Sequence, residues 1–235
     1  MERAIEVIDG IARRTDMALL FHSASGKDSI AMLDLIAPRF RRVVCVYMYI
    51  TKGLEHINRY INWAQARYSN ATFVQVPHYA VSSYVKYGFL GCKQNPKQRI
   101  VTLAEITDLA RRQTGIEWAF FGFKKSDSLN RRVMLGTYEK EAVCEKSKKC
   151  YPLSTYKNSD VLDYIERNGL IKPERYGVHQ SAGTAVNDIG YLLWLRDNFP
   201  NDLKKVFETY PLTERILFEH DYKTETERDA QHQAE

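Results

Sequence analysis

The sequence predicts an α/β protein: a mainly parallel, twisted sheet with helices on both faces, followed by a C-terminal helical region. Two observations support this fold class. Up to about residue 123, short continuous apolar runs alternate with helical patterns, as they do in successive βαβ crossovers. After residue 150, the strand patterns fade and helical patterns continue alone.

The first elements follow this alternation closely. Residues 3–14 place their isoleucines on one side of a helix. MALLF, residues 17–21, is a short apolar run typical of a strand buried on both faces of a parallel sheet. Pro38 ends the next helical stripe near residue 36, because the residue before a proline disfavours helical backbone angles. We then expect a strand over 41–50, a helix over 55–68 and a strand over 71–76.

The second half of the chain adds one strand and then helices. Residues 98–113 show a helical stripe, and EWAFFGF at 117–123 reads as the fourth strand. Later helices are expected over 158–168, 184–198, 201–210 and 212–220. The domain organisation expected is an α/β domain over 1–180, a helical region over 181–222 and a polar tail over 223–235, which lacks aromatic residues and is expected to be disordered.

Composition limits the function classes only broadly. The chain has 235 residues and a net charge of +5, which suits an anionic small substrate or a nucleic acid and requires neither. No apolar run approaches the roughly 20 residues that span a bilayer. The acidic, weakly apolar start does not read as a secretory signal, so the four cysteines are expected to be reduced. We therefore expect a cytoplasmic protein without a membrane segment.

The loop HSASGKDS, residues 22–29, carries the strongest functional signal. It leaves the carboxyl end of the first strand, where parallel sheets bind their ligands. Small residues let backbone amides approach an anion, and the following helix directs its positive end at the loop. The competing interpretation is a tight turn in which serine and aspartate only cap the helix. The residues that could contact phosphate are Ser23, Ser25, Gly26, Lys27, Asp28 and Ser29.

The spacing of the loop excludes two common nucleotide motifs. It lacks the long spacer of the Walker P-loop and the spaced glycines of the dinucleotide fingerprint. Gly26-Lys27-Asp28-Ser29 instead resembles the PP-loop, Ser-Gly-Gly-x-Asp-Ser, of the N-type ATP pyrophosphatase and phosphoadenosine phosphosulfate (PAPS) reductase superfamily, an adenine nucleotide alpha hydrolase-like group. Ala24 and Ser25 depart from the serine and glycine usual in that motif.

Two further segments extend the resemblance. GFKKSDSLNRR, 122–132, is similar to the basic segment that follows the fourth strand in this family. YPLSTYKNSDVLDYIERNGLIKPERY, 151–176, is similar to its later signature. The three segments occur in the family's order, so the chain is identified as a member of the superfamily.

The resemblance implies a nucleotide-binding domain and roles for individual residues. Lys27, Asp28 and Arg131 would be catalytic, and Asp28 would also help to hold Mg²⁺. Of the four cations after the fourth strand, which include Lys124, we favour Lys125 and Arg131 as anion ligands, with Arg132 next. The adenine would lie against the end of the second strand, at backbone atoms near Tyr47, Met48 and Tyr49.

Cysteines and histidines bear on the type of reaction. No cysteine follows Cys150, so the C-terminal nucleophile of the PAPS reductases is missing. Cys92, Cys144 and Cys150 could anchor an iron–sulfur cluster, but scattered reduced thiols are the favoured explanation. His22, and His179 in GVHQSAGT, could each be a base, a phosphate donor or a structural residue.

Three functions stay open from the sequence. The first is cleavage of ATP to AMP and pyrophosphate, with transfer of the adenylate to sulfate, a small molecule or a nucleic acid. The second is an adenylyl-sulfate reductase or sulfurtransferase that uses a thiol or an iron–sulfur cluster. The third is a nucleotide-binding subunit that performs no chemistry and acts with a partner. The sequence indicates neither the acceptor nor the oligomeric state.

Overall fold

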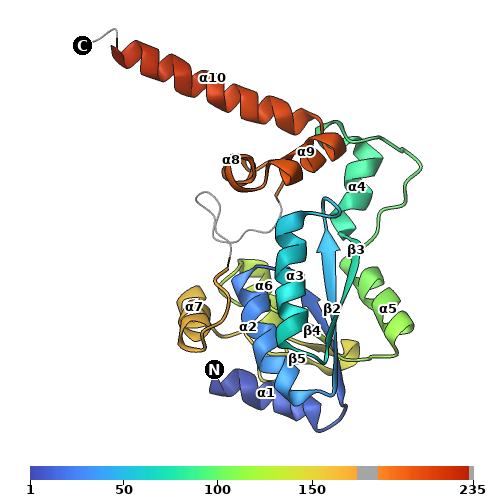
Figure 1. Ribbon diagram of the computed structural model, residues 1–235. Coiled ribbons are helices and arrows are strands. Elements are labelled where there is room, and N and C mark those ends of the chain that lie inside the picture. Colours follow the sequence, from blue (N-terminus) through green and yellow to red (C-terminus); the bar gives the residue numbers. More distant parts are fainter. Residues whose placement is uncertain (174–184, 233–235) are drawn as a thin grey trace. The chain divides into compact units, whose positions relative to one another are not determined.

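A six-stranded, mainly parallel sheet confirms the predicted fold class (Figure 1). The computed structural model describes residues 1–173 and 185–232, with side chains described up to residue 223. The strands lie in the order β3-β2-β1-β4-β6-β5. Their bounds are β1 Met17–His22, β2 Arg42–Tyr49, β3 Ala71–Pro77, β4 Ala119–Phe121, β5 Val143–Cys144 and β6 Lys149–Cys150.

Strand pairing follows from the apolar runs that the sequence shows. β1 pairs in parallel with β2 on one side and with β4 on the other, and Phe21 pairs with Phe121. The central residues Leu19 and Leu20 are fully buried, as a strand covered on both faces requires. β6 continues the parallel sheet beside β4, and β5 closes it as an antiparallel edge.

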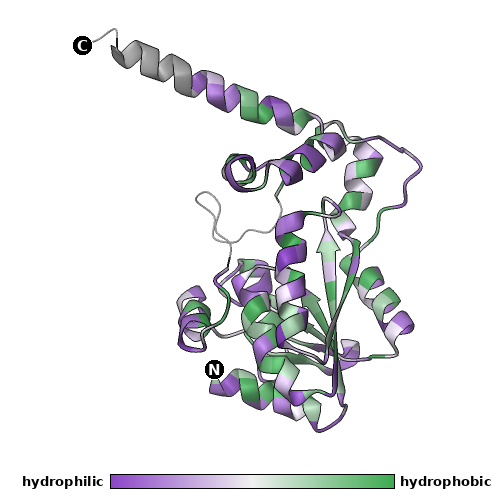
Figure 2. Cartoon of the chain, in the orientation of Figure 1, coloured by the Kyte–Doolittle hydropathy of each residue, from purple (hydrophilic) through white to green (hydrophobic). Residues whose placement is uncertain are grey.

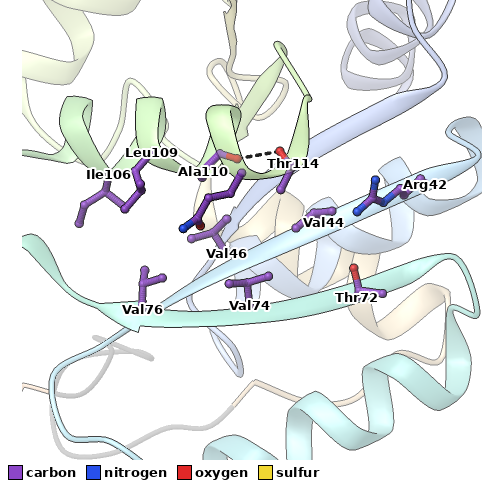
Figure 3. A pocket seen from close by; sticks show the side chains of 11 residues that line it. Arg42, Val44, Val46, Thr72, Val74, Val76, Ile106, Leu109, Ala110 and Thr114 are labelled. Atoms are coloured by element: carbon purple, nitrogen blue, oxygen red, sulfur yellow. Dashed lines mark hydrogen bonds between the residues drawn. The ribbon is translucent and has the colours of Figure 1, made fainter.

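Six α-helices belong to the same part of the described chain as the sheet. The chain passes from β1 through α2 to β2 and through α3 to β3, and then returns through α5 to β4, so α5 lies on the face opposite α3 (Figures 1 and 3). α2 ends at Ile36, and Pro38 lies in the short 3-10 helix that follows. The bounds are α1 Glu2–Ala12, α2 Lys27–Ile36, α3 Glu55–Arg67, α5 Leu103–Thr114, α6 Leu129–Gly136 and α7 Asn158–Arg167.

An apolar groove of about 220 Å³ separates α5 from β2 and β3 (Figure 3). Val44 and Val46 form its floor on β2, and Val74 on the edge strand β3 is 39% exposed. Leu109 of α5 is 42% exposed on the opposite wall. None of the loop residues 23–29 lines this groove, so it is separate from the predicted nucleotide loop.

The chain divides into two compact units. Unit 1 contains residues 1–48, 57–76 and 102–174, which include most of the sheet. Unit 2 contains residues 49–56, 77–101 and the C-terminal helices. Its elements are α4 Tyr79–Tyr87, the 3-10 helix η2 Phe89–Gly91, α8 Ile189–Asn198, α9 Pro200–Thr209 and α10 Leu212–His232.

The C-terminal region is helical, as the sequence predicts. α10 runs past residue 222, where the polar tail was expected to begin, because glutamate, arginine, glutamine and alanine in this segment favour helix. The boundary between 180 and 181 and the disorder of 223–235 stay predictions, since residues 174–184 and 233–235 lie outside the described residues. No helix in the described ranges has the length and apolar character that a bilayer crossing requires.

A buried histidine closes the core of unit 1 beneath the loop. His22, the last residue of β1, is 3% exposed, and its Nε2 lies 3.2 Å from the Tyr60 hydroxyl. The imidazole also packs edge-on against Phe73. Burial lowers the pKa of His22 to about 3, so the ring is neutral at physiological pH.

A buried histidine–aspartate pair organises unit 2. The carboxylate of Asp202 on α9 accepts hydrogen bonds from the Glu55 amide at 2.7 Å and the His56 amide at 3.1 Å. It also lies 2.8 Å from Nδ1 of His56, and both side chains are fully buried. Asp202 therefore satisfies amides that the first turn of α3 leaves without helical partners.

We expect His22 to make stability depend on pH. Between pH 6.5 and about pH 3 the unfolded chain binds a proton at this site and the folded chain does not, so the free energy of unfolding falls as the pH falls. The loss should be on the order of 4 kcal/mol. Urea unfolding across this pH range should show it, and His22→Phe should remove it. Parallel pH profiles of the two proteins would contradict the assignment.

Removal of the Asp202 carboxylate should destabilise the protein strongly. Asp202→Ala leaves two amides of α3 and the buried His56 ring without their acceptor, which should lower the free energy of unfolding by about 3 kcal/mol. Asp197→Ala is the matched control, because its side chain is 66% exposed and, among the residues that the structure describes, pairs only with Arg196. The control should change stability by less than about 0.5 kcal/mol. Equal effects in urea unfolding would show that Asp202 is not a structural anchor.

Candidate functional site

The loop between β1 and α2 presents a row of backbone amides. The first helical hydrogen bond of α2 runs from the Ile30 amide to the Gly26 carbonyl at 3.0 Å. The amides of Lys27, Asp28 and Ser29 precede it and so have no helical partner. Across residues 24–29, no amide bonds to another residue that the structure describes. These groups carry the positive end of the helix dipole and can bind an anion.

Short contacts fix the shape of this loop. The Ser23 amide donates to Oγ of Ser29 at 2.8 Å, and the two serine hydroxyls lie 2.8 Å apart. A Cβ on Gly26 would lie 2.6 Å from Oγ of Ser23, so a larger residue would not fit there. Ala24 has a φ of 55°, in the left-handed region that costs an alanine roughly 1 kcal/mol. Strain of this kind is common where a loop is shaped for a ligand.

The chain that follows β4 lies beside the loop, because β1 and β4 are parallel neighbours. Gly122 allows the close approach, since a Cβ there would lie 3.1 Å from Cβ of Asp28. Nζ of Lys124 lies 2.6 Å from Oδ2 of Asp28. Nζ of Lys27 lies 3.3 Å from the same oxygen. The loop and the basic segment thus meet at one edge of the sheet.

Lys124 is the most deeply buried cation of this cluster. Its side chain is fully buried, and Nζ also lies 3.2 Å from Oδ1 of Asp127. The ammonium group of Lys124 is therefore held between two carboxylates. Oδ1 of Asp28 is buried without a hydrogen-bond partner among the described residues. This oxygen, at the mouth of the loop, keeps bonding capacity for a ligand.

A turn after β4 orients the other cations. The Lys124 amide donates to Oδ2 of Asp127 at 2.9 Å, and Arg131 pairs with the same carboxylate at 2.6 Å. The Arg131 guanidinium lies 3.9 Å from the centre of the Phe123 ring. Burial raises the pKa of Asp127, but the bonds from Lys124 and Arg131 outweigh it and hold this pKa below its usual value. Asp127 is therefore a carboxylate that holds two cations in place.

The other two predicted anion ligands, Lys125 and Arg132, lie away from Asp28. Lys125 pairs with Glu141 at 2.6 Å, and its amide donates to the Ser154 carbonyl. Arg132 is exposed on α6. Neither contacts Asp28. Sequence reasoning favoured Lys125 over Lys124, and the signal that distinguishes them is Asp127, which closes the turn around Lys124.

The adenine site was predicted at the end of β2. Met48 and Tyr49 are the last residues of this strand and are partly exposed. The Tyr49 carbonyl accepts a hydrogen bond from the His78 amide at 2.8 Å, so this carbonyl is already engaged. Within unit 1, β2 pairs with β1 up to His22 and Tyr47, which brings the end of β2 next to the start of the loop.

The cysteines do not form a metal site in the described residues. Cys144 and Cys150 lie one position apart in the β5–β6 pairing, so their side chains point to opposite faces of the sheet. Cys92 belongs to unit 2, where its thiol donates to the Tyr84 carbonyl. No group of three metal-ligating side chains occurs in the described ranges. The structure therefore offers no support for the three-cysteine cluster that the sequence left open.

Of the two histidines that the sequence offers as candidates, the structure describes His22. His22 is neutral, buried and packed between aromatic rings, so it is unsuited to proton transfer with a ligand. His179 lies outside the described residues.

Comparisons with known proteins agree with the motifs. The sequence model of the phosphoadenosine phosphosulfate reductase domain matches residues 18–178. No curated protein sequence matches the chain.

Two solved structures illustrate the distant structural similarity. The U34-tRNA thiolase NcsA from Methanococcus maripaludis, with its 4Fe-4S cluster, is 15% identical with a TM-score of 0.42, over 92% of this chain and 79% of that one. The NH3-dependent NAD synthetase from Campylobacter jejuni subsp. jejuni, in complex with the nitrate ion, is 10% identical with a TM-score of 0.44. The match covers 92% of this chain and 93% of the synthetase chain. The family match covers well over half of the sequence, and the chain therefore belongs to the phosphoadenosine phosphosulfate reductase domain family.

Proposed function

We propose that the protein binds ATP at residues 23–29, cleaves it between the α and β phosphates and transfers the adenylate to an acceptor. The observation that carries this proposal is the row of unpartnered amides at the start of α2, with Lys27 and Lys124 beside it. Preorganised amides and cations stabilise an anion without the cost of reorganising water. We also expect the protein to act in the cytoplasm, in sulfur-related chemistry, as family membership suggests.

The balance of charge at the site favours a polyanion. Lys27, Lys124 and Arg131 are three cations, and Asp28 and Asp127 are two carboxylates, so the cluster carries a net charge of +1 before the helix dipole is counted. The amides of residues 24–29 would hold one phosphate group, and Lys27 and Lys124 would neutralise the adjoining one. Arg131, held by Asp127, would complete the grip on the leaving pyrophosphate.

The reaction is a substitution at the α-phosphorus. An oxygen of the acceptor forms a bond to the α-phosphorus. The bond between the α-phosphorus and the oxygen that bridges it to the β-phosphorus breaks, and pyrophosphate leaves with the electrons of that bond. Negative charge grows on the pyrophosphate, next to Lys124 and the open amides, which stabilise it. His22 is too deeply buried to take a proton from an acceptor, so the acceptor is expected to be already ionised or to lose its proton to water.

A magnesium ion fits this site in a limited way. Oδ1 of Asp28 is the one buried, unpartnered carboxylate oxygen found there among the described residues. Mg²⁺ commonly uses one or two carboxylates together with substrate phosphates, and this donor set suits that pattern. When bound, the ion would neutralise charge on the phosphates.

The first test measures pyrophosphate release from ATP and Mg²⁺, with sulfate and oligonucleotides as acceptors. We expect Lys27→Ala to lower the rate by about 100-fold or more, because a preorganised charge at the phosphates is lost. Binding of α,β-methylene ATP, followed by calorimetry, separates binding from chemistry. Lys140→Ala is the control, since the Lys140 side chain is exposed and forms an ion pair only with Glu6 in the described part of the chain.

The outcomes separate the alternatives. An unchanged rate in Lys27→Ala would remove the loop from the mechanism. Nucleotide binding without pyrophosphate release under any condition would favour a non-catalytic subunit. Sulfite release from adenylyl-sulfate in the presence of a thiol would favour the reductase or sulfurtransferase alternative.

A second test distinguishes Lys124 from its neighbour Lys125. We expect Lys124→Met to weaken α,β-methylene ATP binding by about 10- to 100-fold, because a charge-assisted contact contributes about 1.5–3 kcal/mol. Lys125→Met should change binding less than about threefold, since Lys125 pairs with Glu141. Thermal unfolding of both variants checks that the fold persists, and Lys124→Arg should restore part of the affinity. A larger loss in Lys125→Met would reverse the assignment.

A further inference from the structure

An acid-free segment forms a distinct surface of unit 2. Between Glu55 and Glu105 the sequence contains no aspartate or glutamate. Residues 78–101, which connect β3 to α5, carry Lys86, Lys93, Lys97 and Arg99 together with several tyrosines. We call residues 78–101 the basic arm. Such a concentration of cations without acids is unusual in a chain whose overall charge is only +5.

Local hydrogen bonds give the basic arm a defined structure. His78 caps the start of α4, and Gly88 ends it in the left-handed conformation. The chain then returns alongside α4 (Figure 1). The Asn95 amide donates to the Val85 carbonyl at 2.8 Å, and the Val101 amide donates to Oγ of Ser82 at 2.9 Å. The segment that returns after α4 is thus fixed to this helix at Asn95 and at Val101.

The aromatic residues of the basic arm serve two different purposes. Tyr84 and Phe89 stack with their ring centres 4.3 Å apart, and Tyr84 also meets Tyr210 edge-on, which anchors the arm within unit 2. Tyr87 is 67% exposed and Tyr79 is 38% exposed. These outer rings do not contribute to the core, and α4 contains no buried residue.

One lysine of the basic arm lies beside an outer ring, and two others are exposed on the returning loop. Lys86, Lys93 and Lys97 form no ion pair with any residue that the structure describes. Lys93 and Lys97 are exposed, and Nζ of Lys86 lies 5.9 Å from the centre of the Tyr87 ring. The returning loop that carries these lysines is strongly hydrophilic (Figure 2). Lys86, Lys93 and Lys97 are therefore available for an external anion.

We propose that the basic arm binds single-stranded nucleic acid. Unpaired lysines suit a row of phosphates, and an exposed tyrosine beside them suits the face of an unstacked base. Gln94 and Asn95 on the same loop each use one side-chain amide atom within the arm, and Oε1 of Gln94 and Nδ2 of Asn95 remain for base edges. An acidic protein would use the lysines but would gain little from Tyr87. This inference goes beyond the proposed ATP chemistry and does not require it.

The test measures binding of a fluorescein-labelled 15-residue oligo-uridine by the full chain, at several salt concentrations. We expect Lys86→Gln/Lys93→Gln/Lys97→Gln to weaken binding about tenfold or more. The slope of log affinity against log salt should become shallower by about 2, which is about 0.7 for each lost phosphate contact. Tyr87→Ala should weaken binding about tenfold with the slope unchanged, because stacking is lost and charge is not.

Matched controls make the test decisive. Lys52→Gln/Lys204→Gln/Lys223→Gln removes the same charge from exposed positions of unit 2 and should leave both affinity and slope unchanged. Equal losses in the two triple variants would show that net charge alone binds the oligonucleotide and would overturn the proposal. Absence of oligonucleotide binding by the unmodified chain would also overturn the proposal. So would a result in which polyglutamate displaces the labelled oligonucleotide as well as unlabelled oligo-uridine does and Tyr87→Ala has no effect on binding. Lys27→Ala should still bind the oligonucleotide, so failure of the ATP proposal is seen separately.

Discussion

Parallel pairing of β1 with β4 is the constraint on which the candidate site depends. The two strands are distant in sequence, and their pairing places the ends of both at one edge of the sheet. The loop of residues 23–29 and the turn that holds Lys124 consequently share a small volume. Gly122 at the end of β4 and Gly26 in the loop leave space for this approach. Without that pairing, each segment alone would be an ordinary turn.

The site departs from the rules that stabilise the rest of the fold. In unit 2, the buried side chains of His56 and Asp202 satisfy one another. At the loop, the amides and Oδ1 of Asp28 lack hydrogen-bond partners among the described residues, and Ala24 adopts a strained conformation. Proteins tolerate such costs mainly where a ligand recovers them. This contrast supports a functional interpretation more strongly than the loop sequence does.

Sequence patterns predicted the elements with strong periodicity and missed those that depend on tertiary contacts. β1, α2 and the Gly26-to-Ser29 motif were predicted because apolar runs and small residues are local signals. α4 was missed, since its tyrosines, valines and serines are poor helix formers and its capping by His78 is visible only in the structure. β5 and β6 contain two residues each, too few for a pattern. The sequence does not show that Lys124 rather than Lys125 lies against Asp28, because this depends on the turn closed by Asp127.

The contact between Asp28 and two lysines has a consequence for selectivity. Asp28 serves as an internal counter-ion, which prevents Lys27 and Lys124 from repelling each other while no guest is bound. Any incoming anion must compete with this carboxylate. Under the proposed function, a triphosphate would have the advantage over a halide that it can engage both ammonium groups at once. Asp28 would then hold the two lysines in position before the nucleotide binds.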